Sequence, residues 1–134
     1  MLKISKSVEY ALLALRYIAT RNGLANAKEI SRNADIPYEL LAKILQKLNR
    51  ENIIESRQGK RGGYALSVKP EKLSLLTVMN ALGQNVQLTD CLFETATADD
   101  CKRIRDCALI DPMTKIQNRI AALFKEFTLN EIIN

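Results

Sequence analysis

The chain has 134 residues, of which 47% are apolar, and its formal net charge is +5 with no histidine. This length suits one domain, or a small domain with an appendage, and the apolar content is enough for a core. The lack of histidine excludes Ser/His and Cys/His catalytic sites, and no signal peptide or run of about eighteen apolar residues occurs, so we expect a cytoplasmic protein.

The chain is predicted to begin with two helices. Apolar residues at helical spacing indicate a helix over residues 3–21, with Gly23 as its stop. Asn26 and Glu29 resemble a capping box, in which Asn26 is the cap and the Glu29 side chain reaches back to it. The short helix that this box opens is expected to run to about Asn33.

A third helix, to about Arg50, has two distinct faces, and Pro37 suits its first turn. Its apolar face consists of Leu40, Leu41, Ile44, Leu45 and Leu48. Its polar face consists of Glu39, Lys43, Gln46, Lys47 and Arg50, with the small Ala42 between them. Two short helices joined by a tight turn, the second with a polar outer face, predict a helix-turn-helix.

A glycine-rich hairpin is predicted directly after the third helix. Ile53 and Ile54 start one strand, residues 57–63 form a basic tip, and residues 64–66 return. Such a helix could enter the major groove of duplex DNA, and such a wing could contact its backbone or minor groove. A surface helix and a solvated turn are the alternative interpretation, which the direct succession of the two elements disfavours.

The second half of the chain is predicted to hold a short helix and a long one. Ser74 is a candidate cap for a helix to Leu82, and periodicity then fails from Gln84 to Cys107. Asp111 and Pro112 suit the start of a helix that runs to about residue 127. Its apolar stripe consists of Met113, Ile116, Ile120, Leu123, Phe124 and Phe127. This stripe predicts pairing with a second copy, with packing inside one chain as the alternative.

Positive charge is concentrated in the first half of the chain. Residues 1–72 hold 14 Lys/Arg and 7 Asp/Glu, whereas residues 73–134 hold 6 and 8. A basic half suits a polyanion, so double-stranded DNA is the expected partner, and an adaptor that binds proteins is the alternative. An enzyme is disfavoured because no nucleophile–base set or phosphate-binding loop occurs.

Three cysteines, Cys91, Cys101 and Cys107, lie in the aperiodic segment. An odd number of cysteines without an export signal disfavours structural disulfides, so three reduced thiols are one interpretation. The acidic residues around them are Asp90, Glu94, Asp99, Asp100 and Asp106.

Five segments match one family of bacterial regulators in the same order. They are residues 8–12, 36–38, 45–48, 57–64 and 128–133. The wing, Arg57-Gln58-Gly59-Lys60-Arg61-Gly62-Gly63-Tyr64, is the most specific of them. Over essentially its full length the chain resembles the Rrf2 family of winged helix-turn-helix regulators, which includes the cluster-bearing repressors IscR and NsrR.

The resemblance implies a homodimer that binds a palindromic operator, with the long C-terminal helices crossed at the interface. The residues that it implies for DNA contact in the recognition helix are Tyr38, Glu39, Ala42, Lys43, Gln46 and Lys47. In the wing they are Arg57, Lys60 and Arg61, with Arg61 favoured for the minor groove because its negative potential attracts guanidinium. Gly62 and Gly63 would let the backbone approach the sugar-phosphate edge closely.

The resemblance also implies an iron–sulfur cluster, [2Fe-2S] or [4Fe-4S], on Cys91, Cys101 and Cys107. Three thiolates leave one ligand position open, and Glu9 supplied by the partner is the expected fourth ligand, with the nearby acidic residues as rivals. The last gap of five residues matches the family, whereas the first gap of nine is longer than in IscR and NsrR. A cluster-free thiol sensor and a zinc site are the alternatives.

The sequence therefore predicts a mainly α fold with a small β-hairpin wing, built as a winged helix-turn-helix plus a long C-terminal dimerisation helix. The expected divisions are a DNA-binding domain over 1–83, a sensor loop over 84–108, and the dimerisation helix with a terminal turn over 109–134. The expected function is that of a transcription regulator, a repressor, whose operator affinity depends on the cluster.

Overall fold

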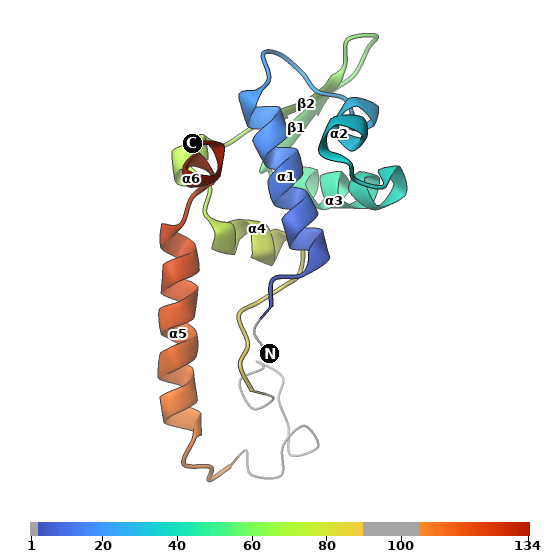
Figure 1. The fold of residues 1–134 in the computed structure, drawn as a ribbon. Helices are drawn as coiled ribbons and strands as arrows, with labels where there is room; N and C mark the ends of the chain where they lie inside the picture. Colours follow the sequence, from blue (N-terminus) through green and yellow to red (C-terminus); the bar gives the residue numbers. More distant parts are fainter. Residues whose placement is uncertain (1–2, 90–104) are drawn as a thin grey trace.

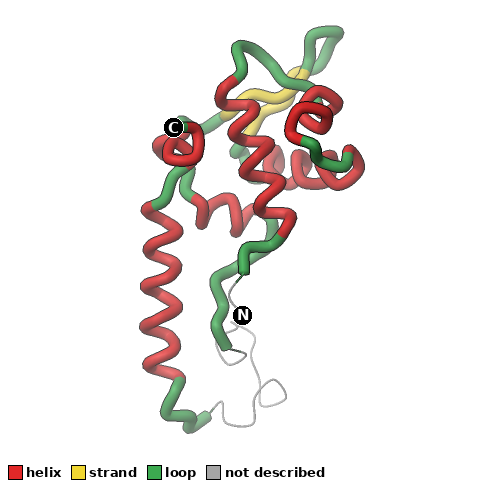
Figure 2. Tube along the Cα trace, viewed as in Figure 1, coloured by secondary structure: helices red, strands yellow, loops and turns green. Residues whose placement is uncertain are grey.

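The computed structural model describes residues 3–89 and 105–134 of the chain. The described part is mainly helical and carries one two-stranded antiparallel hairpin (Figure 1, Figure 2). Its elements are α1 (Lys6–Thr20), α2 (Ala27–Ala34), α3 (Tyr38–Arg50), β1 (Ile54–Arg57), β2 (Gly63–Leu66), the 3₁₀ turn η1 (Pro70–Lys72), α4 (Leu75–Ala81), α5 (Ile110–Glu126) and α6 (Leu129–Ile133). This architecture confirms the predicted fold class.

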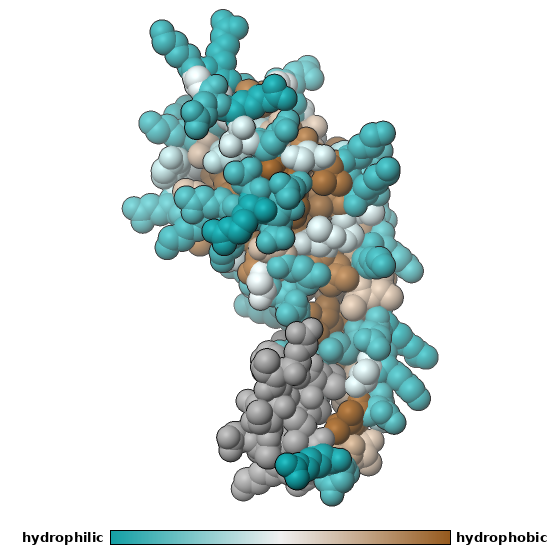
Figure 3. All heavy atoms as spheres, turned by 180° about the vertical axis from the view of Figure 1, so that it is seen from behind, coloured by the Kyte–Doolittle hydropathy of each residue, from teal (hydrophilic) through white to brown (hydrophobic). Residues whose placement is uncertain are grey.

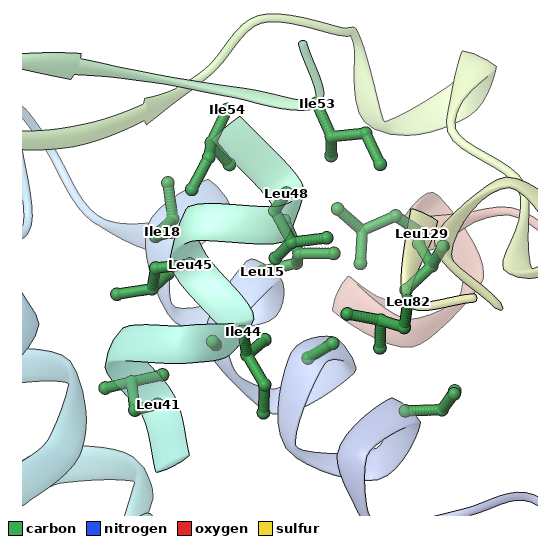
Figure 4. Packing of buried hydrophobic residues seen from close by; sticks show 14 of the residues in the cluster. Leu15, Ile18, Leu41, Ile44, Leu45, Leu48, Ile53, Ile54, Leu82 and Leu129 are labelled. Atoms are coloured by element: carbon green, nitrogen blue, oxygen red, sulfur yellow. The ribbon is translucent and has the colours of Figure 1, made fainter. Parts of the chain in front are cut away.

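The core lies around α1, which runs through the middle of the globular part (Figure 1). The buried residues of α1 are Val8, Ala11, Ala14, Leu15 and Ile18. Those of α3 are Leu41, Ile44, Leu45 and Leu48, and Figure 4 shows several of them beside Leu15 and Ile18. Because each buried aliphatic side chain stabilises the fold by roughly 1.5–3 kcal/mol, this packing fixes which face of α3 points outward.

Side-chain caps set the starts of the first two helices. Ser5 Oγ accepts a hydrogen bond from the Val8 N–H at 3.3 Å, so α1 begins at Lys6 and not at residue 3 as predicted. Asn26 Oδ1 accepts from the Glu29 N–H at 2.8 Å, which confirms Asn26 as the cap of α2. The prediction that the Glu29 carboxylate reaches back to Asn26 is wrong, because that carboxylate is bound to α1.

A polar cluster joins the end of α1 to the start of α2. The Tyr17 hydroxyl donates to Glu29 Oε2 at 2.8 Å, and Arg21 forms an ion pair with the same oxygen. Arg21 Nε also donates to the Leu24 carbonyl at 3.2 Å, which holds the connecting loop. The hydrogen bond to Glu29, together with partial burial, raises the pKa of the Tyr17 phenol above its ordinary value.

The turn between α2 and α3 is held by local hydrogen bonds. Asp35 adopts the left-handed conformation with φ of 53°, and its N–H donates to the Ser31 carbonyl. Ser31 Oγ donates to the carbonyl of the buried Ile36 at 2.6 Å. Pro37 is the N-cap of α3 and does not lie within its first turn, so the helix begins at Tyr38. These contacts fix the angle between the two helices of the helix-turn-helix.

The hairpin is attached to the helical part by one further backbone bridge. The Ala25 N–H donates to the Tyr64 carbonyl at 3.1 Å, and the Tyr64 N–H donates to the Ala25 carbonyl at 2.8 Å. Ala25 is fully buried and directly precedes the cap of α2. The start of α2 and the return strand of the wing are therefore held at a fixed spacing.

The end of the chain returns to the core beside α1. Ser74 caps α4 as predicted, but Leu75 is buried there and Leu76 is only half-buried. Leu129, in α6, is 2% exposed, and its N–H donates to the Leu73 carbonyl at 2.8 Å. α6 thus belongs to the globular part, although α5 separates it in sequence from the other elements of that part.

Helix α5 extends away from the globular part (Figure 1). Its N-cap is Leu109, so Asp111 lies in the first turn and is not the cap that the sequence predicted. None of its residues is fully buried, and Leu123 and Ile116 of the apolar stripe are 61% and 43% exposed. Neither α5 nor any other helix in the described ranges has the length and apolar character to cross a membrane.

Candidate nucleic-acid interface and cysteine segment

The polar face of α3 is exposed along the helix because the opposite face is held in the core. Tyr38, the first residue of α3, is 48% exposed. The other predicted contact residues of this face, Glu39, Lys43, Gln46 and Lys47, are exposed as well, and Ala42 is half-buried between them. Hydrogen-bond donors and acceptors on one helix face are what contact with base edges and phosphates requires.

The tip of the wing presents cations beyond the helical part. Arg57 Nη2 donates to Glu55 Oε1 at 3.2 Å, an exposed pair that contributes little stability. Lys60 and Arg61 are exposed, and neither forms an ion pair within the described residues. The structure therefore carries the polar face of α3 and a cationic wing on the same globular part.

The two glycines at the end of the wing tip have a structural role that sequence reasoning missed. A Cβ on Gly62 would overlap the Arg57 carbonyl oxygen, and one on Gly63 would lie 2.7 Å from the Ala25 carbonyl oxygen. Gly63 thus lets β2 approach and pair with Ala25. A glycine inside a strand pattern is the signal that could have indicated such a close backbone approach. Contact of these glycines with the DNA backbone stays a prediction.

Only part of the predicted cysteine site lies in the described residues. Cys91 and Cys101, with four of the nearby acids, lie outside them. Cys107 is half-buried, and its Sγ accepts a hydrogen bond from the Leu109 N–H at 3.4 Å, just before α5. Asp106 is exposed beside it. The described ranges contain no cluster of three or more His, Cys, Asp or Glu side chains that could hold a metal ion.

An apolar groove of about 690 Å³ lies between α1 and the end of α5. Its lining includes Tyr10, Leu13, Leu123 and Phe127, with Glu9 at its edge. The Glu9 carboxylate is exposed and forms an ion pair with Lys6 at 3.3 Å. Figure 3 shows patches of brown, apolar surface on the globular part and on the part that contains α5.

The structure separates Glu9 from Cys107 within one chain. Glu9 lines the same groove as Leu123, near the end of α5, whereas Cys107 precedes the start of α5. A helix rises about 1.5 Å per residue, so the stretch from Ile110 to Leu123 spans about 20 Å. A single subunit therefore does not bring this carboxylate to Cys107.

Comparison with known proteins agrees with this architecture. A family model described as Rrf2, iron-dependent transcriptional regulator, matches residues 4–134. The chain belongs to the Rrf2 family. A provisionally named HTH-type transcriptional regulator of Aquifex aeolicus is 29% identical over 133 residues, which cover 97% of this chain and 90% of that protein. NsrR of Bacillus licheniformis is 25% identical, over 98% of this chain and 92% of NsrR.

Solved structures share the fold at lower identity. CymR, titled the global cysteine regulator of B. subtilis, superposes with a TM-score of 0.76 at 20% identity, covering 99% of this chain and 97% of CymR. IscR of T. potens gives a TM-score of 0.74 at 18% identity, covering 98% of this chain and 86% of IscR. The Rrf2 chain is thus a transcription regulator with a DNA-binding winged helix-turn-helix, as the sequence predicted.

We expect the variant Gly63→Ala to be less stable than the wild type. The added Cβ would lie 2.7 Å from the Ala25 carbonyl oxygen, so the backbone must shift, and overpacking of this kind costs about 1–3 kcal/mol. Urea unfolding followed by circular dichroism measures the loss. Gln58→Ala, at the exposed tip of the same wing, is the control and should change stability by less than about 0.5 kcal/mol. Equal stability of Gly63→Ala and the wild type would contradict the role assigned to Gly63.

Proposed function

We propose that this Rrf2 chain is a homodimeric repressor whose affinity for a palindromic operator is controlled by an iron–sulfur cluster. The observation that carries the proposal is the exposed polar face of α3 beside a cationic wing, both fixed to one core. The names of its relatives, which include NsrR and IscR, support the cluster.

In this proposal α3 enters the major groove and the wing reaches the adjacent minor groove. Lys43 and Gln46 suit base edges, because lysine pairs with guanine acceptors and glutamine pairs with adenine. The remaining contacts on α3 are Tyr38, Glu39, Ala42 and Lys47. Arg57, Lys60 and Arg61 of the wing contact phosphates or the minor groove, where the narrow width strengthens the negative potential that attracts Arg61.

Pairing of two copies through α5 is the second part of the proposal. The apolar stripe of α5 and the groove beside α1 are open in one chain and would be covered by the same surfaces of a partner. A symmetric dimer presents two recognition helices to two half-sites about 34 Å apart, which suits a palindrome. We propose the division into residues 1–83, 84–108 and 109–134 on this basis, with α6 returning to the core of the first part.

The cluster is proposed to be held by Cys91, Cys101 and Cys107 with Glu9 of the partner subunit. Thiolates suit iron, the chain has no histidine to serve as the fourth ligand, and the resemblance to NsrR favours a carboxylate at the position of Glu9. The separation of Glu9 from Cys107 in one chain supports supply by the partner. When bound, the cluster supplies a redox-sensitive link between the two subunits.

The described residues give this link a route to the DNA-binding part. The Leu88 N–H donates to Gln117 Oε1 at 3.0 Å, so the segment that leads to Cys91 is held against α5. Glu9 lies on α1, whose buried face packs on α3. Release of Glu9 would alter the spacing of the two recognition helices, and only a difference in DNA affinity between the two states makes this a switch.

A cluster-free thiol sensor of the same fold is the alternative function. Its support is the structure of Staphylococcus aureus CymR in an oxidised form, which superposes with a TM-score of 0.72 at 18% identity. In that case Cys101 and Cys107 would oxidise or form a disulfide. Mass spectrometry after mild peroxide treatment, with and without iron, separates the two functions.

The variant Arg61→Ala should bind an operator selected from a random duplex pool about tenfold more weakly, equivalent to about 1.4 kcal/mol. The loss should be largest for A·T-rich flanks, because their narrow minor groove favours an inserted guanidinium. Fluorescence anisotropy with A·T-rich and G·C-rich flanks measures it, and Arg61→Lys is the control that keeps the charge. Unchanged affinity and flank preference in Arg61→Ala would refute the assignment of the wing.

The variant Glu9→Ala should release the cluster faster than the wild type after anaerobic reconstitution. The expected wild-type product has visible absorbance with bound iron and sulfide, and the variant should lose this absorbance more rapidly under a chelator. Glu71→Ala removes an exposed carboxylate in η1 and serves as the control. Equal decay in wild type and Glu9→Ala would refute the fourth ligand, and a colourless, iron-free wild type that binds DNA fully would refute the cluster.

A further inference from the structure

The outward face of α2 carries two cations that the contacts proposed above leave unused. Lys28 and Arg32 are four residues apart, so they lie on one face of the helix, and both are exposed. Neither forms an ion pair within the part of the chain that the structure describes. Like charges at this spacing are unfavourable for a helix on its own. An anion outside the chain would relieve that repulsion.

The acidic residue of α2, which also lines the hollow described below, has its carboxylate bound by groups at the end of α1. The Glu29 carboxylate accepts a hydrogen bond from Tyr17 and an ion pair from Arg21, both at the end of α1. The Glu29 side chain is only 19% exposed as a result. The negative charge of Glu29 is therefore paired with Arg21, and Lys28 and Arg32 keep their positive charges unpaired within the described residues.

The two cations border a hollow that reaches the recognition helix. Its volume is about 560 Å³, and it is lined by Asn26, Ala27, Lys28, Glu29, Arg32 and Tyr38. Tyr38 is also the first residue of α3 and is 48% exposed, so the hollow continues into the proposed major-groove surface. An ammonium, a guanidinium and a phenol hydroxyl are all groups that donate hydrogen bonds to phosphate oxygens.

We propose that Lys28 and Arg32 form a second phosphate-binding surface, which binds the DNA backbone at the edge of the groove that α3 enters. Tyr17 and Arg21 are positioning residues for it, since they hold the Glu29 carboxylate against α1. This surface rests on the proposed DNA-binding function. Contacts of this kind fix the register of the protein on the duplex and do not read sequence.

The test measures binding of the full-length protein to a labelled mixed-sequence duplex of about 25 base pairs across a range of KCl concentrations. Each lost phosphate contact reduces the slope of log K against log salt by about 0.9, which corresponds to about eightfold in affinity at 0.1 M salt. We expect this change for Lys28→Gln and for Arg32→Gln, with circular dichroism to confirm folding. Arg32→Lys should keep the wild-type slope.

The matched control is Lys72→Gln, which removes an exposed lysine in η1 beside α6, on the other side of α1 from α2 (Figure 1). Its slope should equal that of the wild type. If Lys28→Gln and Arg32→Gln also match the wild type, the second surface is refuted while DNA binding stands. If the wild type itself shows no salt-dependent binding to the duplex, the proposed DNA function fails as well.

A second arm tests the positioning of Glu29, and its first variant leaves the charge of the protein unchanged. Tyr17→Phe removes one of the two groups that hold the Glu29 carboxylate and should weaken binding to the same duplex. Adding Glu29→Gln to that variant removes the freed charge and should restore binding. Unchanged binding in Tyr17→Phe, or no recovery in the double variant, would overturn the positioning role of Tyr17.

Discussion

The constraint on which the rest of the structure depends is the partly exposed apolar stripe of α5. This helix has 17 residues and not one of them is fully buried in a single chain. An isolated helix of this length is marginal in water, and its stability comes mainly from packing of its apolar face. In the proposed dimer, a second copy would meet this need because one symmetric contact would cover both stripes.

The same contact would set the distance between two DNA-binding surfaces. α5 is joined to the globular part at its end, where the Leu75 N–H donates to the Phe127 carbonyl at 2.8 Å and Leu129 enters the core. Its start follows directly after the segment that contains Cys107. A change at the cysteines therefore acts on one end of the proposed dimer helix, while the recognition helix is packed on the part fixed to the other end.

The features that the sequence predicted correctly have local causes. The caps at Asn26 and Ser74 and the two faces of α3 follow from spacing within a few residues. The features that the sequence did not predict join residues that are farther apart in the chain. The Glu29 carboxylate bonds to Tyr17 and not to Asn26 at the start of its own helix, and Ala25 pairs with Tyr64. For the candidate site, periodicity was enough to predict the polar face of α3, and a glycine-rich basic segment between two short strands was enough to predict the wing. A ligand set shared between subunits rests on family resemblance.

The most direct test of this account is the mass of the protein in solution, measured by sedimentation equilibrium. The account predicts twice the chain mass of 15.1 kDa for the wild type. It predicts a shift to the monomer for Leu123→Glu, in the stripe, and no shift for the exposed Asn118→Glu on the opposite side of α5. A wild-type protein that sediments as a monomer at micromolar concentration, or a Leu123→Glu variant that stays dimeric, would contradict it.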